Sequence, residues 1–130
     1  MPMISLDFTT DADPYTESAF AQGMDLCGYH APSLGNSAAF LEVQVSLNWD
    51  AQPGTTTAQK DATATWETLK DAEDANFQFP VAVGSTRAVR FNPADMMVLE
   101  RFRLKAVQSG GADANQTTGT VHLMMGKVRA

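Results

Sequence analysis

Apolar and polar positions alternate along residues 40–49 of the chain. Successive side chains of a β-strand point to opposite faces of its sheet, so this alternation predicts a strand with one buried face and one solvent-facing face. Such a strand belongs to a sheet that packs one side against a second sheet. The predicted buried side chains are Leu41, Val43, Val45, Leu47 and Trp49, and the predicted solvent-facing ones are Glu42, Gln44, Ser46 and Asn48.

Seven further segments have the alternation or composition of strands, and turn-forming residues separate them at intervals of roughly ten residues. We therefore expect about eight short strands in one all-β domain over residues 1–130, folded as an antiparallel β-sandwich. A jelly roll is the favoured topology, and an immunoglobulin-like strand order is the alternative. The seven segments are residues 3–9, 24–31, 64–69, 76–83, 87–91, 97–107 and 119–128.

The segments between the predicted strands contain no convincing amphipathic helix. Residues 55–63 are rich in Thr and Ala and are predicted to form a mobile polar loop. Residues 92–95 have Asn at a cap position followed by Pro, which predicts a single helical turn. Residues 108–118 are predicted to form a long flexible loop because they are rich in Gly, Ser and Asn.

The composition fits one globular domain of ordinary size. The chain has 130 residues, of which 44% are hydrophobic, and this is enough to bury a two-layer core. No apolar run approaches the roughly 18 residues of a membrane span, and the first residues lack the pattern of a signal peptide. Cys27 is the only cysteine. An intrachain disulfide framework is therefore excluded, and we expect synthesis in a reducing cytoplasm without a membrane partner.

The net charge of −6 argues against nucleic acid as a partner, because affinity for phosphate depends largely on Lys and Arg. The distribution is uneven: residues 1–59 hold seven acidic residues and no Lys or Arg, whereas residues 60–130 hold nine basic and eight acidic residues. This split has two interpretations. It reflects either a generally soluble surface or electrostatic complementarity between copies of the chain.

The sequence contains no recognisable catalytic motif, and we expect no enzyme activity, cofactor or metal. Cys27 and His30 share one predicted strand three positions apart, which places their side chains on opposite faces and separates a nucleophile from its base. His122 is predicted to lie at the surface. Two carboxylates, Asp11 and Asp13, fall short of the roughly six to eight oxygen ligands that Ca²⁺ prefers.

Four segments spread over most of the chain share their pattern with one class of proteins. They are residues 26–32, a strand closed by a proline turn; 40–48, a long alternating strand; 66–71, a short strand anchored by Trp66; and 92–95 leading to 102–105, a proline turn before a basic strand. In these segments the chain resembles small virion structural proteins of tailed bacteriophages. The resemblance implies a non-enzymatic component of the virion.

The function that we expect is that of a capsid decoration (cement) protein. It would be made in the host cytoplasm, form a homo-oligomer, most simply a trimer, and bind the major capsid protein on the outer surface of the virion. The alternative is a head-fibre or tail component whose sandwich binds a glycan or receptor through exposed aromatic residues. For Trp49, however, the strand alternation places the side chain on the buried face and so predicts a core position. The candidate assembly surface comprises Arg101, Arg103, Lys105, Glu42, Met96 and Met124, with Met97 and Met125 beside them, and the candidate glycan-binding aromatics are Tyr15, Tyr29, Trp49 and Trp66.

Overall fold

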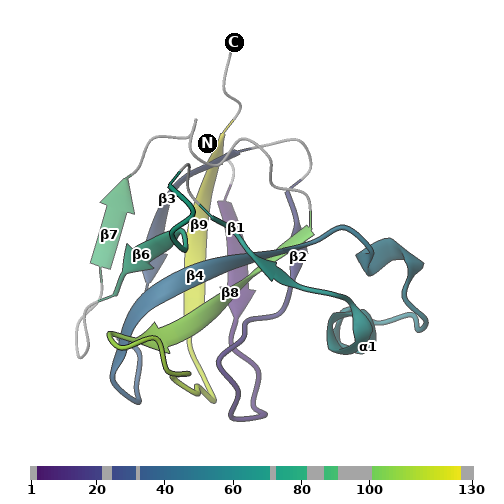
Figure 1. Cartoon of the computed structure of the whole chain (residues 1–130), viewed down its shortest axis with the longest axis horizontal. Coiled ribbons are helices and arrows are strands. Elements are labelled where there is room, and N and C mark those ends of the chain that lie inside the picture. The colour runs from purple at the N-terminus through teal and green to yellow at the C-terminus, as the bar shows by residue number, and fades with distance from the viewer. Residues whose placement is uncertain are drawn as a thin grey trace.

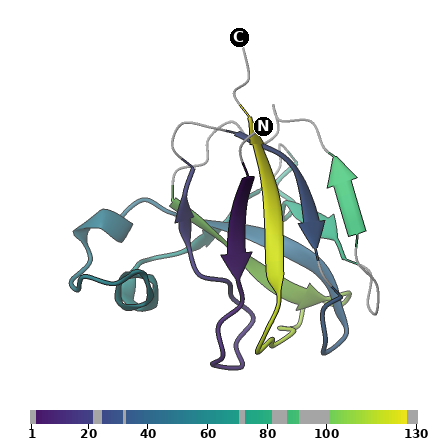
Figure 2. The ribbon, with the colours of Figure 1, turned by 180° about the vertical axis from the view of Figure 1, so that it is seen from behind.

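Two antiparallel sheets pack face to face in the computed structural model of the chain (Figure 1). The structure describes residues 3–21, 25–31, 33–70, 73–81, 87–90 and 101–126. The first sheet has the order β1 (Met3–Asp7), β9 (Thr120–Gly126), β3 (Asp25–Ala31) and β7 (Arg87–Arg90), and Figure 2 shows it in front. The second sheet has the order β2 (Ala19–Phe20), β8 (Arg101–Gln108), β4 (Ala38–Ser46) and β5 (Glu67–Thr68), with β6 (Gln78–Pro80) also paired to β4.

The strand order is that of a jelly roll, as the sequence predicts. The first strand pairs with the last, β2 pairs with β8, β3 pairs with β7, and β4 pairs with both β5 and β6. The chain is thus one long hairpin whose successive strand pairs alternate between the two sheets. The short strands β5 and β6 together occupy the position of one strand along β4.

Alternating residues from both sheets form the core. The inward residues of β8 and β9 are fully buried, which confirms the alternation predicted for these strands. Tyr29 of β3 is also fully buried, and its hydroxyl donates a hydrogen bond of 2.5 Å to the carbonyl oxygen of Pro80. The largest buried side chains of the core are Tyr29, Phe102, Leu6, Leu41, Leu104, Leu123, Met125, Val43, Val107 and Val121.

The prediction for the outer face of β4 is wrong. Glu42, Gln44 and Ser46 point away from the core, yet they are only 5%, 7% and 4% exposed. Polar side chains of neighbouring strands cover them: Glu42 Oε2 accepts hydrogen bonds from Asn76 Nδ2 at 2.7 Å and from Gln78 Nε2 at 2.9 Å. The outer face is therefore a packed polar layer and not a solvent-facing one.

The end of the predicted strand 40–49 is also wrong. β4 ends at Ser46, and Trp49 belongs to a short 3-10 helix, η1 (Trp49–Ala51), so it is not in the core. The side chain of Asn48 turns the chain, because its Oδ1 accepts hydrogen bonds from Ser46 Oγ at 3.0 Å and from Thr65 N at 2.9 Å. Leu47 lies at this turn and is 92% exposed.

A helix, α1 (Thr57–Thr63), replaces the predicted mobile loop and lies at the side of the sandwich (Figure 1). Its N-terminus has a complete capping box: Gln59 N donates to Thr56 Oγ1, and Gln59 Oε1 accepts from the backbone of Thr56. This pairing satisfies helix N–H groups that have no partner within the helix. The spacing of Thr56 and Gln59 is a sequence signal for a helix start.

The predicted loop 108–118 is fixed at its far end. Ala114 and Gln116 are buried, and the Gln116 side chain donates to the carbonyl oxygen of Gly35 at 2.6 Å and accepts from Gly35 N at 3.0 Å. The predicted helical turn at 92–95 lies outside the described residues. Among the described helices, none has the length and hydrophobicity needed to cross a membrane.

We expect the substitution Leu104→Ala to lower the free energy of unfolding by about 2–5 kcal/mol, because it leaves a cavity at a fully buried position between the sheets. Urea denaturation measures this loss. The control is Leu47→Ala, which removes the same atoms from an exposed position and is expected to change the stability of the single chain by less than about 0.5 kcal/mol. Equal losses in the two variants would contradict the assigned strand phase.

Candidate functional site

The three basic residues of β8 lie beneath aromatic side chains. Arg101, Arg103 and Lys105 point outward as predicted, but each is only partly exposed. The guanidinium carbon of Arg101 lies 3.5 Å from the centre of the Trp49 ring, and Lys105 Nζ lies 5.8 Å from that of Tyr15. The chain's own side chains therefore cover much of this basic face of β8.

Arg103 occupies the middle of this arrangement. Its guanidinium carbon lies 3.8 Å from the ring centre of Tyr15 and 4.3 Å from that of Trp66, and its Nε donates to Gln44 Oε1 at 2.8 Å. Cation–aromatic contacts of this kind contribute from about 0.5 to about 2 kcal/mol, the larger values applying where water is excluded. We refer to Trp49, Arg101, Trp66, Arg103, Tyr15 and Lys105 as the cation–aromatic row.

Asp61 of α1 holds the helix against the row. Its Oδ1 accepts hydrogen bonds from Ser18 Oγ at 2.5 Å and from Trp49 Nε1 at 2.7 Å, and its Oδ2 accepts from Ser18 N at 3.0 Å. Its backbone oxygen accepts from Trp66 Nε1 at 3.0 Å. Ser18 Oγ in turn accepts from Arg101 Nε at 2.8 Å. Arg101, Ser18, Asp61 and Trp49 therefore form a closed ring of contacts.

The charges of the two halves of the sequence meet within one chain. Burial lowers the pKa of both Arg101 and Arg103, and nearby carboxylates, including Asp50 for the former and Asp13 for the latter, oppose this shift. Within the second half, Lys105 Nζ also lies 3.1 Å from Asp113 Oδ1. Complementarity within the chain thus accounts for part of the charge split, which weakens the argument for complementarity between copies.

A cleft of about 490 Å³ lies between the turn 9–17 and α1. Arg103 and Trp66 of the row line it together with residues of that turn and of the helix. Its walls carry both apolar and polar groups, and its ionisable residues are Asp11, Asp13, Tyr15, Glu17, Asp61 and Arg103. We refer to it as the cleft.

Two further hollows flank Leu47. One, of about 450 Å³, is lined by Phe20, Trp49 and Arg101 among others, and Phe20 is 49% exposed. The other, of about 420 Å³, includes Val45 and Leu69. Leu47 lines both and protrudes between them, so we refer to Leu47 with its two hollows as the Leu47 ridge. Nothing in the alternating pattern of the sequence predicts this exposed leucine.

The residues of the expected assembly surface do not form one patch. Lys105 and Glu42 are opposite each other on β8 and β4, and Glu42 is buried. Met124 is partly exposed on β9, which belongs to the other sheet, where it lies opposite Met3. Met125 is fully buried. The described members of this set therefore belong to both sheets, and their role in assembly stays a prediction. Met96 and Met97 lie outside the described residues.

The structure brings His30 and His122 together, which the sequence does not predict. They are opposite each other on β3 and β9, their ring centres are 6.1 Å apart, and His122 Nδ1 lies 2.8 Å from Ser5 Oγ. Within the described ranges, no three His, Cys, Asp or Glu side chains gather as metal ligands.

Of the four aromatic residues considered for glycan binding, three lie in the cation–aromatic row. Tyr15, Trp49 and Trp66 are half-buried there, whereas Tyr29 belongs to the core. Their gathering depends on α1 and on the pairing of β8 with β4. Comparisons of the chain with protein-family models, with curated proteins and with solved structures found no match.

We expect Asp61→Asn to lower the free energy of unfolding by about 2 kcal/mol. The substitution replaces one carboxylate oxygen by an NH₂ group, which faces a donor of Ser18 or Trp49 and cannot accept its hydrogen bond. The indole N–H resonance of Trp49 should shift in the NMR spectrum, since Asp61 Oδ1 is its acceptor. The matched control is Asp50→Asn, at an exposed carboxylate that accepts no hydrogen bond from a described residue. Unchanged stability and an unchanged Trp49 resonance in Asp61→Asn would contradict the role of the ring.

Proposed function

We propose that the chain is a non-enzymatic virion structural protein of a tailed bacteriophage, most simply a homo-oligomeric capsid decoration protein. It binds the major capsid protein on the outside of the virion and stabilises the head. The resemblance of the sequence to small phage virion proteins supports this role, as does the jelly roll, an architecture used in viral capsid domains. A shared architecture is an analogy, so the argument for assembly rests on the surface.

The observation that carries the proposal is the Leu47 ridge. A single exposed apolar residue is ordinary, but here a leucine that is 92% exposed stands beside a phenylalanine that is 49% exposed, with a hollow on each side. Burial of one leucine side chain stabilises a complex by about 1.5–3 kcal/mol. The ridge is therefore suited to act as an anchor at the centre of a larger interface.

The partner that best fits the ridge is a second copy of the chain. The protruding residue and the hollows lie side by side, so each copy carries both the residue that inserts and the hollow that receives it. When Leu47 of each copy occupies the Phe20 hollow of the next in a head-to-tail sense, the contacts close into a ring if successive copies are related by a threefold rotation. We propose a trimer. Three copies of one capsid-binding surface also strengthen attachment, because the second and third contacts become intramolecular.

A second function is supported by the cleft. A head-fibre or tail component with a glycan-binding or receptor-binding sandwich needs a concave site with aromatic and polar groups, and the cleft provides both. This function is compatible with assembly, because Leu47 does not line the cleft.

The test of assembly is the substitution Leu47→Asp. We expect light scattering coupled to size-exclusion chromatography to give the mass of a trimer for the wild-type chain and that of a single chain for the variant. Co-sedimentation with capsids that lack this protein should fall at least tenfold, since both the anchor and the multivalency are lost. The circular dichroism spectrum should not change, because position 47 contributes nothing to the core.

The control is Met3→Asp, which places the same charge at a 61% exposed apolar residue of the other sheet and should leave the trimer intact. A wild-type chain that is a monomer without affinity for capsids would reject the proposal. So would a Leu47→Asp variant that remains a trimer, or purified virions that do not contain the chain.

A further inference from the structure

We propose that the cleft binds a neutral saccharide, with Arg103 donating hydrogen bonds to its hydroxyl groups and Glu17 and Tyr15 accepting hydrogen bonds from them. This inference gives a site and a ligand class to the second function above, on which it rests. It is independent of the Leu47 ridge and of capsid attachment.

The donor side of the site is Arg103. Its Nε is occupied by Gln44, and within the described part of the chain its terminal Nη1 and Nη2 groups make no hydrogen bond or ion pair. Packing between Tyr15 and Trp66 fixes the plane of the guanidinium. A planar group with two terminal amines presents paired donors, which match two neighbouring oxygen atoms of a ligand.

The acceptor side lies on the turn opposite α1. Glu17 is exposed, and no described residue donates a hydrogen bond to its carboxylate. The hydroxyl of Tyr15 likewise has no hydrogen-bond partner among the described residues, and it can both donate and accept. The carboxylate of Asp61, by contrast, already accepts three hydrogen bonds from the chain itself, so its main role is to hold the wall of the cleft.

The charge of the cleft selects against anionic ligands. Four carboxylates and one guanidinium line it, so its formal charge is −3 and it disfavours phosphates, nucleotides and acidic sugars. A cationic ammonium group only donates hydrogen bonds, so it would leave the terminal amines of Arg103 without acceptors. A neutral polyhydroxyl compound satisfies both the donors and the acceptors, and the C–H face of a sugar ring can pack against the apolar surface of Trp66.

The cleft is formed before any ligand binds. The capping box fixes the start of α1, the hydrogen bonds of Asp61 hold its middle, and Tyr15 N donates to Asp13 Oδ1 at 3.0 Å in the opposite wall. A preformed site loses less affinity to the ordering of side chains. Its volume of about 490 Å³ falls in the range of about 300–1,000 Å³ that is usual for ligand sites.

The test is a titration of the full chain with four neutral trisaccharides, namely maltotriose, cellotriose, mannotriose and N-acetylated chitotriose, and with trigalacturonic acid as the charged probe. Isothermal calorimetry and tryptophan fluorescence report binding. We expect at least one neutral probe to bind with a dissociation constant below about 1 mM, the order expected for a small preformed site. Trigalacturonic acid should bind at least tenfold more weakly.

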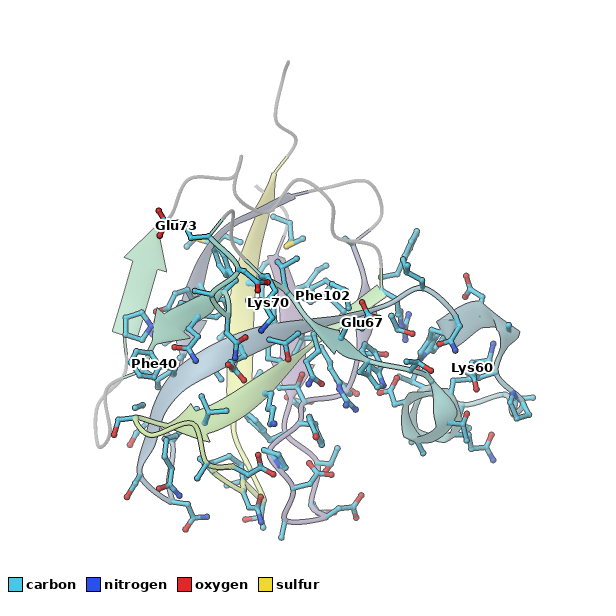
Figure 3. The ribbon with its side chains drawn as sticks, viewed as in Figure 1. Phe40, Lys60, Glu67, Lys70, Glu73 and Phe102 are labelled. Carbon is cyan, nitrogen blue, oxygen red and sulfur yellow. The ribbon has the colours of Figure 1, made fainter. Side chains whose placement is uncertain are left out.

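Glu17→Gln and Tyr15→Phe should each weaken binding of that probe about tenfold without changing the circular dichroism spectrum, since neither altered group forms a hydrogen bond with a described residue. The matched control is Asp74→Asn, which removes an exposed carboxylate from the turn between β5 and β6 and should leave the affinity unchanged. Figure 3 shows the neighbouring Glu73 on the opposite side of the molecule from Lys60 of α1.

The proposal is overturned if none of the neutral probes binds, if trigalacturonic acid binds more tightly than they do, or if Glu17→Gln and Tyr15→Phe leave the affinity unchanged. The mass of the same wild-type sample in solution tests trimer formation separately. A trimer without saccharide binding therefore rejects the site alone, and a monomer that binds saccharide rejects assembly alone.

Discussion

The outer face of the second sheet depends on one carboxylate. Asp61 brings a charge into contact with the sheet, and three donors from Ser18 and Trp49 compensate for the water that it loses. These donors come from the segment before β2 and from η1, so a single side chain of α1 joins three parts of the chain that are distant in sequence. The helix has no buried residue of its own. Its position therefore depends on these polar contacts and on its caps, and not on an apolar face.

Because α1 is held in this position, the basic residues of β8 are packed beneath aromatic rings instead of being solvated. Arg101 packs against Trp49, and Arg103 packs against Tyr15 and Trp66. Their Nε groups donate to Ser18 and Gln44, respectively. This arrangement uses the charged residues within the fold. It moves the case for assembly from the charges to the exposed apolar ridge at Leu47. It also leaves the terminal amines of Arg103 without a hydrogen-bond partner among the described residues.

The sequence predicted the features that depend on local periodicity. Alternation along β4, β8 and β9 correctly identified Leu41, Leu104 and Leu123 as core residues, because a period of two is a property of the strand itself. It could not predict the burial of Glu42, which depends on Gln78 of β6 and on Asn76 just before that strand. The helix start at Thr56 and Gln59 was present in the sequence as a capping box. The contact of Asp61 with Trp49 could not be predicted from the sequence, since it depends on the direction that the chain takes at the turn after β4.

The cation–aromatic row lies between the two proposed sites. Trp49 and Arg101 line a hollow of the Leu47 ridge, Trp66 and Arg103 line the cleft, and Asp61 holds both tryptophans through its carboxylate and its backbone oxygen. Such a connection transmits a free-energy coupling only when the connecting element has two arrangements that the ligands distinguish. The contacts of Asp61 describe one arrangement, in which both oxygens of its side chain accept hydrogen bonds from close donors. The row therefore acts as a rigid support for both sites, and saccharide binding and assembly are expected to proceed without affecting each other.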